Sequence, residues 1–184
     1  MREPDRARLL YRLRELRENG VRIIFDCNFR PILWGSHEKN EDSPETNALP
    51  WYEKAIAASD IVFISRDEIR VLGLASGTES RDVCTAVRNA GATEAVLKDG
   101  GGYCHIATAE NEVSVPARRL ETVVDTTAAG DSFSAAYILG RHLGLSPEAA
   151  AAGAHVLAAA VVSNRGAAIP ADAMPDVFPG TLLS

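Results

Sequence analysis

A stretch of small and polar residues in the second half of the chain has the composition of an anion-binding helix start. It reads Asp125-Thr126-Thr127-Ala128-Ala129-Gly130-Asp131-Ser132-Phe133 and opens a long segment with helical character. Small side chains let the backbone N–H groups of Ala128, Ala129 and Gly130 face an anion, and the helix dipole favours negative charge there. Asp131 falls in the first turn, where a carboxylate can accept a proton from an alcohol while the amides hold a transferring phosphoryl group. On chemistry alone, an acid that only caps the helix fits equally well.

A second candidate segment, Asp26-Cys27-Asn28-Phe29-Arg30-Pro31, follows the short β-branched run 21–25. The planar guanidinium of Arg30 offers a donor fork that suits a carboxylate or a phosphate. An ordinary surface salt bridge is the alternative for this side chain.

A third candidate is the glycine-rich segment Lys98-Asp99-Gly100-Gly101-Gly102, which follows the apolar run 95–97. Consecutive glycines allow a phosphate to approach the backbone closely. The segment is not a Walker A loop, because the chain has no G-x-x-x-x-G-K-[ST] pattern. A glycine-rich turn with no ligand remains the alternative.

Two single residues complete the set of candidates. Glu68, in Ser65-Arg66-Asp67-Glu68, fits either an acid of a site or a solvated acid in a first helical turn. His155 stands alone among alanines of the last helix, a setting more typical of a core residue than of a ligand. The three cysteines lack C-x-x-C spacing, so neither a disulfide framework nor a zinc site is expected.

The elements that must position these residues alternate between strand and helix. We expect helices at 5–19, 51–59, 66–72, 81–89, 129–143 and 147–163, strands at 21–25, 61–64 and 95–97, and a hairpin at 103–107 and 112–115. The alternation predicts an α/β fold with a doubly wound, mostly parallel sheet flanked by helices. In such folds ligands bind outside the carboxyl ends of the strands, which is where the candidate loops fall.

Composition excludes several other classes of protein. The chain has 184 residues, 46% hydrophobic and 24% charged, which is ordinary for one globular domain. Its net charge of −6 argues against a nucleic-acid partner, which needs a basic face. No apolar run reaches the roughly 20 residues that span a bilayer, and the N-terminus does not read as a signal peptide. We therefore expect no membrane partner and a cytoplasmic location.

The motifs resemble those of the PfkB/ribokinase carbohydrate kinases. The segment 125–131 is similar to the family signature D-T-x-x-A-G-D, although the common form has glycine where this chain has Ala128. The full form D-T-T-A-A-G-D-S-F, together with 26–34 as D-x-N-x-R-x-x-L-W, resembles the subgroup that phosphorylates 2-keto-3-deoxygluconate. Segment 98–102 falls where the family has K-x-G-x-x-G, with a different glycine spacing, and Ser65 replaces the asparagine of N-x-x-E.

The resemblance implies a role for each candidate. Asp131 would be the catalytic base and would also face the substrate, with the amides of Ala128, Ala129 and Gly130 as the anion hole. Asn28 and Arg30 would lie between the sugar acid and the phosphates. The remaining residues implied to act on ATP and Mg²⁺ are Lys98, Gly100, Gly101 and Gly102 at the phosphates, His155 beside the adenine, and Glu68 near the magnesium ion.

The resemblance covers 5–170, and the family carries a substantial segment before this point. We therefore expect residues 1–184 to be the C-terminal, nucleotide-binding and catalytic part of a ribokinase-like domain without its N-terminal portion and lid. The complete protein is expected to be a homo-oligomer. Two alternatives remain: a family kinase for another sugar or a nucleoside, and an inactive ATP-binding fragment. Alone, the chain is expected to be marginally stable, self-associating and inactive.

Overall fold

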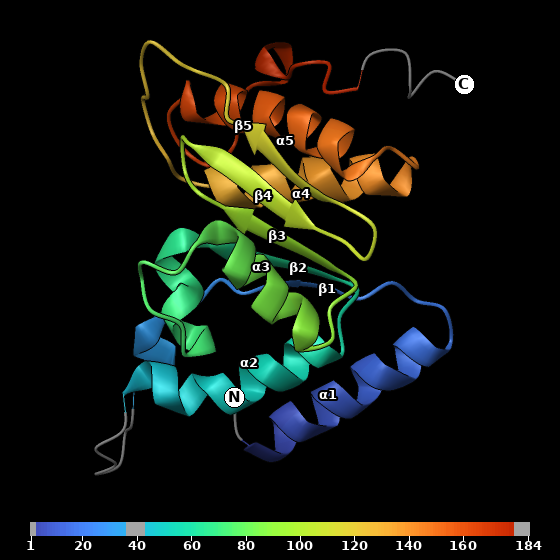
Figure 1. Cartoon of the computed structure of the whole chain (residues 1–184). Coiled ribbons are helices and arrows are strands. Elements are labelled where there is room, and N and C mark those ends of the chain that lie inside the picture. The colour runs from blue at the N-terminus through green and yellow to red at the C-terminus, as the bar shows by residue number, and fades with distance from the viewer. Residues whose placement is uncertain (1–2, 36–42, 179–184) are drawn as a thin grey trace. The chain divides into compact units, whose positions relative to one another are not determined.

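The computed structural model describes residues 3–35 and 43–178 (Figure 1). Their contacts divide the chain into two compact units, Met1–Lys98 with His105–Glu112, and Asp99–Cys104 with Val113–Ser184. The first unit is called unit 1 and the second unit 2. Unit 1 contains α1 (Glu3–Glu18), β1 (Ile24–Asp26), α2 (Pro44–Ala57), β2 (Ile61–Ser65), α3 (Ser80–Asn89) and β3 (Glu94–Lys98). The 3₁₀ segments η1 (Pro31–Leu33) and η2 (Arg66–Leu72) also belong to it.

The sheet has the strand order β1-β2-β3-β4-β5. Strands β1, β2 and β3 run parallel, with Ile61 of β2 in register with Ile24 on one side and Glu94 on the other. Strands β4 (Tyr103–Ala107) and β5 (Glu112–Pro116) follow through connections of four residues, which are long enough only for antiparallel hairpins. The prediction of an α/β sheet flanked by helices is confirmed, and the sheet is mixed, with three parallel strands followed by two antiparallel ones.

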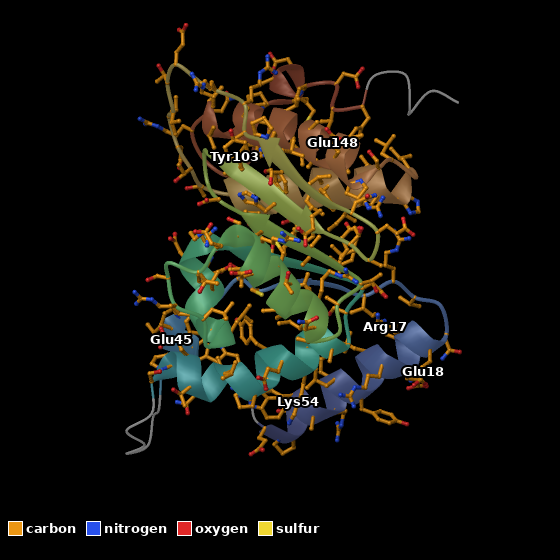
Figure 2. The ribbon with its side chains drawn as sticks, viewed as in Figure 1. Arg17, Glu18, Glu45, Lys54, Tyr103 and Glu148 are labelled. Carbon is orange, nitrogen blue, oxygen red and sulfur yellow. The ribbon has the colours of Figure 1, made fainter. Side chains whose placement is uncertain are left out.

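Buried β-branched and aromatic side chains hold unit 1 together. Val62, Phe63 and Ile64 of β2 are fully buried, as expected for a strand of a parallel sheet with both faces covered. At the end of α1, Arg17 (Figure 2) donates from Nε to Asp60 Oδ1 at 2.9 Å and from Nη1 to the carbonyl of Ala57 at 3.1 Å. No residue of α1 is itself buried. An ion pair and partial burial, rather than a buried apolar face, therefore attach this helix.

Two of the expected helices differ from those observed. Helix α2 begins at Pro44 rather than at 51, because Ser43 caps it by accepting from the backbone N–H of Thr46. Pro50, which suggests a boundary in the sequence, lies inside this helix. The expected helix 66–72 is the 3₁₀ segment η2, which ends at Gly73 in the left-handed region with a φ of 71°. A positive φ is readily adopted by glycine and stops helical propagation.

Unit 2 is built on two packed helices, α4 (Ala129–His142) and α5 (Pro147–Val162). Ser146 caps α5 by accepting from the N–H of Ala149. Both helices lie close to their expected bounds. A short 3₁₀ turn, η3 (Ala171–Ala173), follows them.

Tyr52 of α2 joins the core of unit 1 to the loop that carries the second candidate segment. Its ring packs edge-on against Phe25, Phe29 and Trp34, and its hydroxyl donates to the carbonyl of Cys27 at 2.7 Å. Burial raises the pKa of this phenol. The hydroxyl therefore stays protonated and keeps donating.

We expect Tyr52→Phe to lower the free energy of unfolding by about 1–3 kcal/mol, because the buried carbonyl of Cys27 loses its donor. Tyr11→Phe is the matched control, since Tyr11 is 72% exposed and water replaces its hydroxyl contacts. This control should change stability by less than about 0.5 kcal/mol. Urea unfolding followed by circular dichroism measures both, and equal effects would contradict the structural role of the Tyr52 hydroxyl.

Candidate active site

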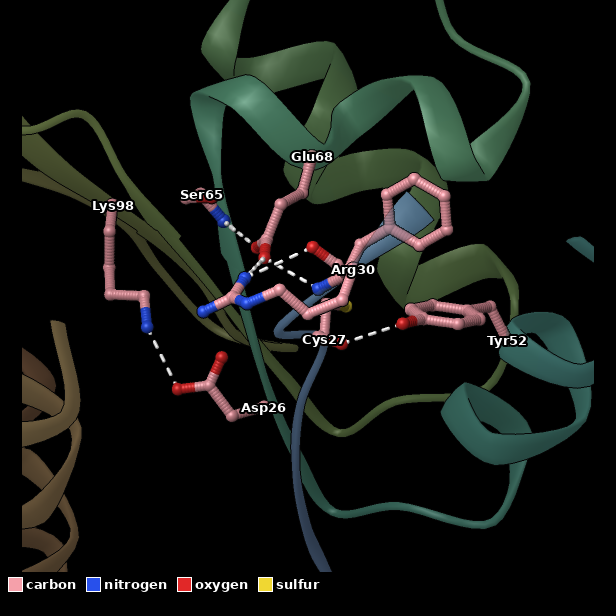
Figure 3. Close-up of polar contacts among 8 residues, drawn as sticks. Asp26, Cys27, Arg30, Tyr52, Ser65, Glu68 and Lys98 are labelled. Atoms are coloured by element: carbon pink, nitrogen blue, oxygen red, sulfur yellow. Dashed lines mark hydrogen bonds and ion pairs between the residues drawn. The ribbon is translucent and has the colours of Figure 1, made fainter. Parts of the chain in front are cut away.

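Glu68 joins the loop that follows β1 to the end of β2 in unit 1 (Figure 3). Its carboxylate accepts from the backbone N–H of Phe29 at 2.7 Å and from that of Ser65 at 2.9 Å. The guanidinium of Arg30 lies 4.0 Å away and donates to the carbonyl of Phe29. The Glu68 side chain is 12% exposed and that of Arg30 is 59% exposed. Glu68 thus shapes the loop, whereas Arg30 presents its charge to solvent.

A second ion pair of unit 1 joins the ends of β1 and β3. Lys98 Nζ lies 2.8 Å from Asp26 Oδ2 and 5.5 Å from the ring centroid of Phe63. Cys27, between these groups and Glu68, is buried, and burial together with the neighbouring carboxylates raises its pKa. This thiol is protonated and unreactive. The structure places Lys98 with Asp26, a residue that sequence reasoning did not select as a site residue although it opens the same segment.

The two described non-glycine residues with positive φ both fall in predicted site segments. Asn28 has a φ of 39° and Ala128 a φ of 61°. Asparagine enters the left-handed region more readily than most residues, whereas alanine pays a steric cost there. Strained backbone of this kind gathers at functional sites. The φ of Ala128 also explains why glycine suits this position.

Asp125 shapes the turn that precedes α4 in unit 2. Its Oδ1 accepts from the N–H of Thr127 at 2.9 Å and its Oδ2 from the N–H of Gly166 at 2.8 Å. Hydrogen bonds from the side chain and backbone of Thr127, and from Gly166, lower the pKa of this carboxyl. Asp125 therefore ties the turn to the loop that follows α5.

The predicted anion hole falls at the start of α4, and its role stays a prediction. Ala128 is the left-handed N-cap of α4, and the carbonyl of Ala128 accepts from the N–H of Ser132 at 2.9 Å. The first N–H groups of a helix have no partner within it. At the start of α4, however, the N–H of Ala129 donates to the carbonyl of Thr126 at 3.2 Å. Asp131 lies in the first turn and is exposed. An exposed carboxylate beside such amides can take a proton from a bound alcohol.

The glycine segment of unit 2 forms the turn between β3 and β4. Gly100 has a φ of 52°, and a Cβ at Gly100 or Gly101 would meet nothing within 4 Å. The N–H of Gly102 closes the turn on the carbonyl of Asp99 at 2.9 Å. The turn is exposed and open, as a phosphate contact would require. Its assignment to the nucleotide stays a prediction.

His155 of α5 is buried in unit 2. Its Nε2 lies 3.2 Å from the carbonyl of Val115, and its ring packs edge-on against Phe133 at 5.0 Å. Burial lowers the pKa of this imidazole. The packing is that of a neutral core histidine, and its predicted place beside an adenine stays a prediction.

A groove of about 600 Å³ runs along α5 in unit 2. One wall is the segment between β5 and α4, the other is α5, and Pro175 completes the lining. The lining residues are Arg118, Arg119, Leu120, Glu121, Thr122, Val124, Val156, Ala159, Ala160, Ser163 and Pro175. Sequence reasoning missed this groove, because its residues come from three separate segments and no motif joins them.

The family model of the pfkB family carbohydrate kinases matches residues 1–174. The chain belongs to this family. Among curated pfkB relatives, the 2-dehydro-3-deoxygluconokinase of Escherichia coli K12 is 43% identical over 174 residues, covering 93% of this chain and 53% of the relative. That of Dickeya dadantii is 40% identical, covering 94% and 54%. The chain spans about half the length of the curated relatives it matches.

Solved structures agree with the pfkB assignment. A putative ribokinase II of E. coli, in complex with ATP and Mg²⁺, has a TM-score of 0.68 at 26% identity, with 84% of this chain and 46% of that chain covered. Aminoimidazole riboside kinase of Salmonella enterica, complexed with aminoimidazole riboside and an ATP analog, has a TM-score of 0.65 at 27% identity, with 91% and 53% covered. The predicted family and fold are confirmed.

Within residues 3–35 and 43–178, no helix is long and apolar enough to cross a membrane. The same residues contain no group of three or more His, Cys, Asp or Glu that could hold a metal ion. Mg²⁺ commonly keeps several waters and binds one or two carboxylates plus substrate phosphates, so a cluster of three acids is not required for it. The place of Glu68 near the ion stays a prediction.

The left-handed N-cap allows a direct test of the backbone geometry before α4. We expect Ala128→Gly to raise the free energy of unfolding by up to about 1 kcal/mol, because glycine removes the steric cost of the positive φ. Ala129→Gly, one residue later in the helix, should lower it by up to about 1 kcal/mol. Urea unfolding of both variants checks the signs, and the same sign for both would contradict the conformation of Ala128.

Proposed function

We propose that residues 1–184 are the C-terminal, nucleotide-binding and catalytic part of an ATP-dependent kinase that phosphorylates the terminal hydroxyl of 2-keto-3-deoxygluconate. The observation that carries the proposal is the exposed Asp131 carboxylate in the first turn of α4, directly after the left-handed turn at Ala128. The pfkB family membership and the names of the relatives at 40–43% identity support the reaction and the substrate.

In this reaction the protein's main task is to hold charge and move one proton. The amides of Ala128, Ala129 and Gly130 are proposed to hold the transferring phosphoryl group, for which the Ala129 N–H must release the Thr126 carbonyl. The Gly100–Gly102 turn is proposed to hold the remaining phosphates. Asp131 accepts the proton of the sugar hydroxyl while the bond from that oxygen to the γ-phosphorus forms and the bond to the β-phosphate oxygen breaks. ADP and the sugar phosphate are the products. Mg²⁺ on the phosphates supplies charge neutralisation, and Glu68 is the proposed residue near it.

The groove along α5 is the proposed place of the nucleotide base. Its volume of about 600 Å³ falls within the usual range for small-molecule sites, and Leu120, Val124, Val156 and Ala159 give it apolar walls. His155, which packs against Phe133, would then support the groove by packing and would not contact the base directly.

Arg30 and Asn28 are proposed to face the sugar acid. The Arg30 guanidinium is more than half exposed and only loosely paired with Glu68 at 4.0 Å, so it can take a second carboxylate. The positive φ of Asn28 turns the backbone of the loop just before Arg30. An arginine at this position would distinguish an acid from a neutral sugar.

Relatives of lower identity favour one alternative, a family kinase for another substrate. Aminoimidazole riboside kinase of Salmonella typhimurium is 34% identical over 130 residues, and 5-dehydro-2-deoxygluconokinase of Bacillus subtilis is 27% identical over 172. The other alternative, an ATP-binding fragment without activity, follows from the half-length match. We also propose a homo-oligomeric complete protein in the cytoplasm, with no nucleic-acid or membrane partner.

The test joins this chain to the N-terminal half of the E. coli relative and measures ADP release with a panel of acceptors. We expect turnover with 2-keto-3-deoxygluconate and little with fructose, 5-dehydro-2-deoxygluconate or a nucleoside. A higher kcat/KM for any of these would contradict the substrate. The 184-residue chain is assayed in parallel, with light scattering, and is expected to self-associate without turnover. Ordinary kinase turnover by this chain as a monomer would contradict the expectation that it is inactive alone.

A further inference from the structure

The ring of Phe178 fills a socket between the two helices of unit 2. Phe178 is 5% exposed. A Cβ at Gly140 of α4 would lie 2.9 Å from Phe178 Cζ, and a Cβ at Gly153 of α5 would overlap the ring. Real Cβ atoms do not approach other atoms so closely. Both helices therefore carry glycine where the ring enters.

The socket and the groove lie on the same stripe of α5. Gly153, Val156 and Ala160 are spaced i, i+3 and i+7, which places them on one face of a helix. Gly153 belongs to the socket, and Val156 and Ala160 line the groove.

The segment before Phe178 connects the two places. It leaves the turn η3, which is closed by bonds from Ala173 N–H to the Pro170 carbonyl at 3.0 Å and from Met174 N–H to the Ala171 carbonyl at 3.3 Å. Pro175 then lines the groove. Two residues separate Pro175 from Phe178, so their Cα atoms are at most about 10 Å apart. Seating Phe178 therefore restrains Pro175 closely.

The family pattern does not account for this contact. The family model matches residues 1–174, so Pro175 and Phe178 lie beyond it. Nothing in the proposed chemistry uses either residue.

We propose that Phe178 is a positioning residue that holds Pro175 as a wall of the groove along α5 and thereby sets the affinity for the base of a purine nucleotide. The inference rests on the proposed function, which places the base in this groove. With Phe178 seated, Pro175 closes one side of the apolar pocket and excludes water from the base. With the ring released, Pro175 no longer closes that side of the groove, and the base is held less tightly by the residues that remain.

The test compares two probes, ATP and inorganic tripolyphosphate, by calorimetric titration of the 184-residue chain. Phe178→Ala is expected to weaken ATP binding about tenfold, the effect of removing a small apolar contact from a pocket. Tripolyphosphate has no base, so its affinity should stay within about twofold. A purely structural role of Phe178 would weaken both probes alike. Met174→Ala is the matched control, because Met174 is 55% exposed on the same segment and does not line the groove.

A second variant guards against a loss of folding. Gly153→Ala expels the ring while leaving Phe178 in the chain, and it should reproduce the selective loss of ATP affinity. Circular dichroism checks that each variant is folded. Equal ATP affinities for the folded variants and the wild type would overturn the positioning role of Phe178 while leaving the ATP site in place. If the wild type binds ATP no better than tripolyphosphate, the base does not occupy the groove. If it binds neither probe, the proposed nucleotide site itself is wrong.

Discussion

In the fusion of this chain with the N-terminal half of the E. coli relative, Asp131→Asn is expected to lower kcat by about 10²–10⁴-fold while ATP binding and the folded structure are retained. The amide side chain keeps the size and the helix-start position of the aspartate but cannot accept the proton of the sugar hydroxyl. Initial rates with 2-keto-3-deoxygluconate give kcat, and calorimetry with ATP gives the affinity.

A matched control separates the base from a capping acid. Glu148 lies in the first turn of α5 (Figure 2) and is exposed, as Asp131 is in α4. Glu148→Gln removes the same kind of charge from the same kind of place, worth about 0.3–1 kcal/mol of stability at a helix start. It should leave kcat unchanged. An Asp131→Asn enzyme with more than about a tenth of the wild-type kcat would show that Asp131 is not the base.

The second large effect is expected at Arg30. Arg30→Ala should weaken the binding of the sugar acid in the transition state by about 1.5–3 kcal/mol, the value of a hydrogen bond to a charged group. This corresponds to roughly 10–150-fold in kcat/KM. A neutral sugar of similar shape should lose little, because it offers no carboxylate to the guanidinium.

Two further variants make the Arg30 result specific. Arg30→Lys keeps the charge but loses the planar fork, so it should recover only part of the affinity. Arg81→Ala removes an equally charged side chain that is 77% exposed and pairs with Glu112. It should leave kcat/KM unchanged for both the sugar acid and the neutral sugar. Equal losses for the acid and the neutral sugar would assign Arg30 to ATP phosphate.

The strands and the positions of the site segments could be predicted because local sequence determines them. The apolar runs 61–64 and 95–97 have few alternatives to buried strands, and both lie within β2 and β3. The predicted helix 51–59 begins too late, because Ser43 caps a helix that starts at Pro44 and continues through Pro50.

Other features depend on contacts between distant segments and leave no local signal. The positive φ of Ala128 is set by the turn around it. The two amides that donate to Asp125 belong to Thr127, two positions further along the chain, and to Gly166, 41 positions further along. The Phe178 socket needs a glycine on each of two helices, and neither glycine is unusual by itself.

The way the chain passes between its two units bears on how it can mature during synthesis. The path enters unit 2 at Asp99, returns to unit 1 at His105 and leaves it again at Val113. Unit 1 therefore cannot make all its contacts until Glu112 has left the ribosome, when most of unit 2 is still untranslated. Neither unit is one continuous stretch of sequence. A cut at any single peptide bond consequently leaves at least one unit in two pieces, and the two cannot be expressed separately as uninterrupted chains.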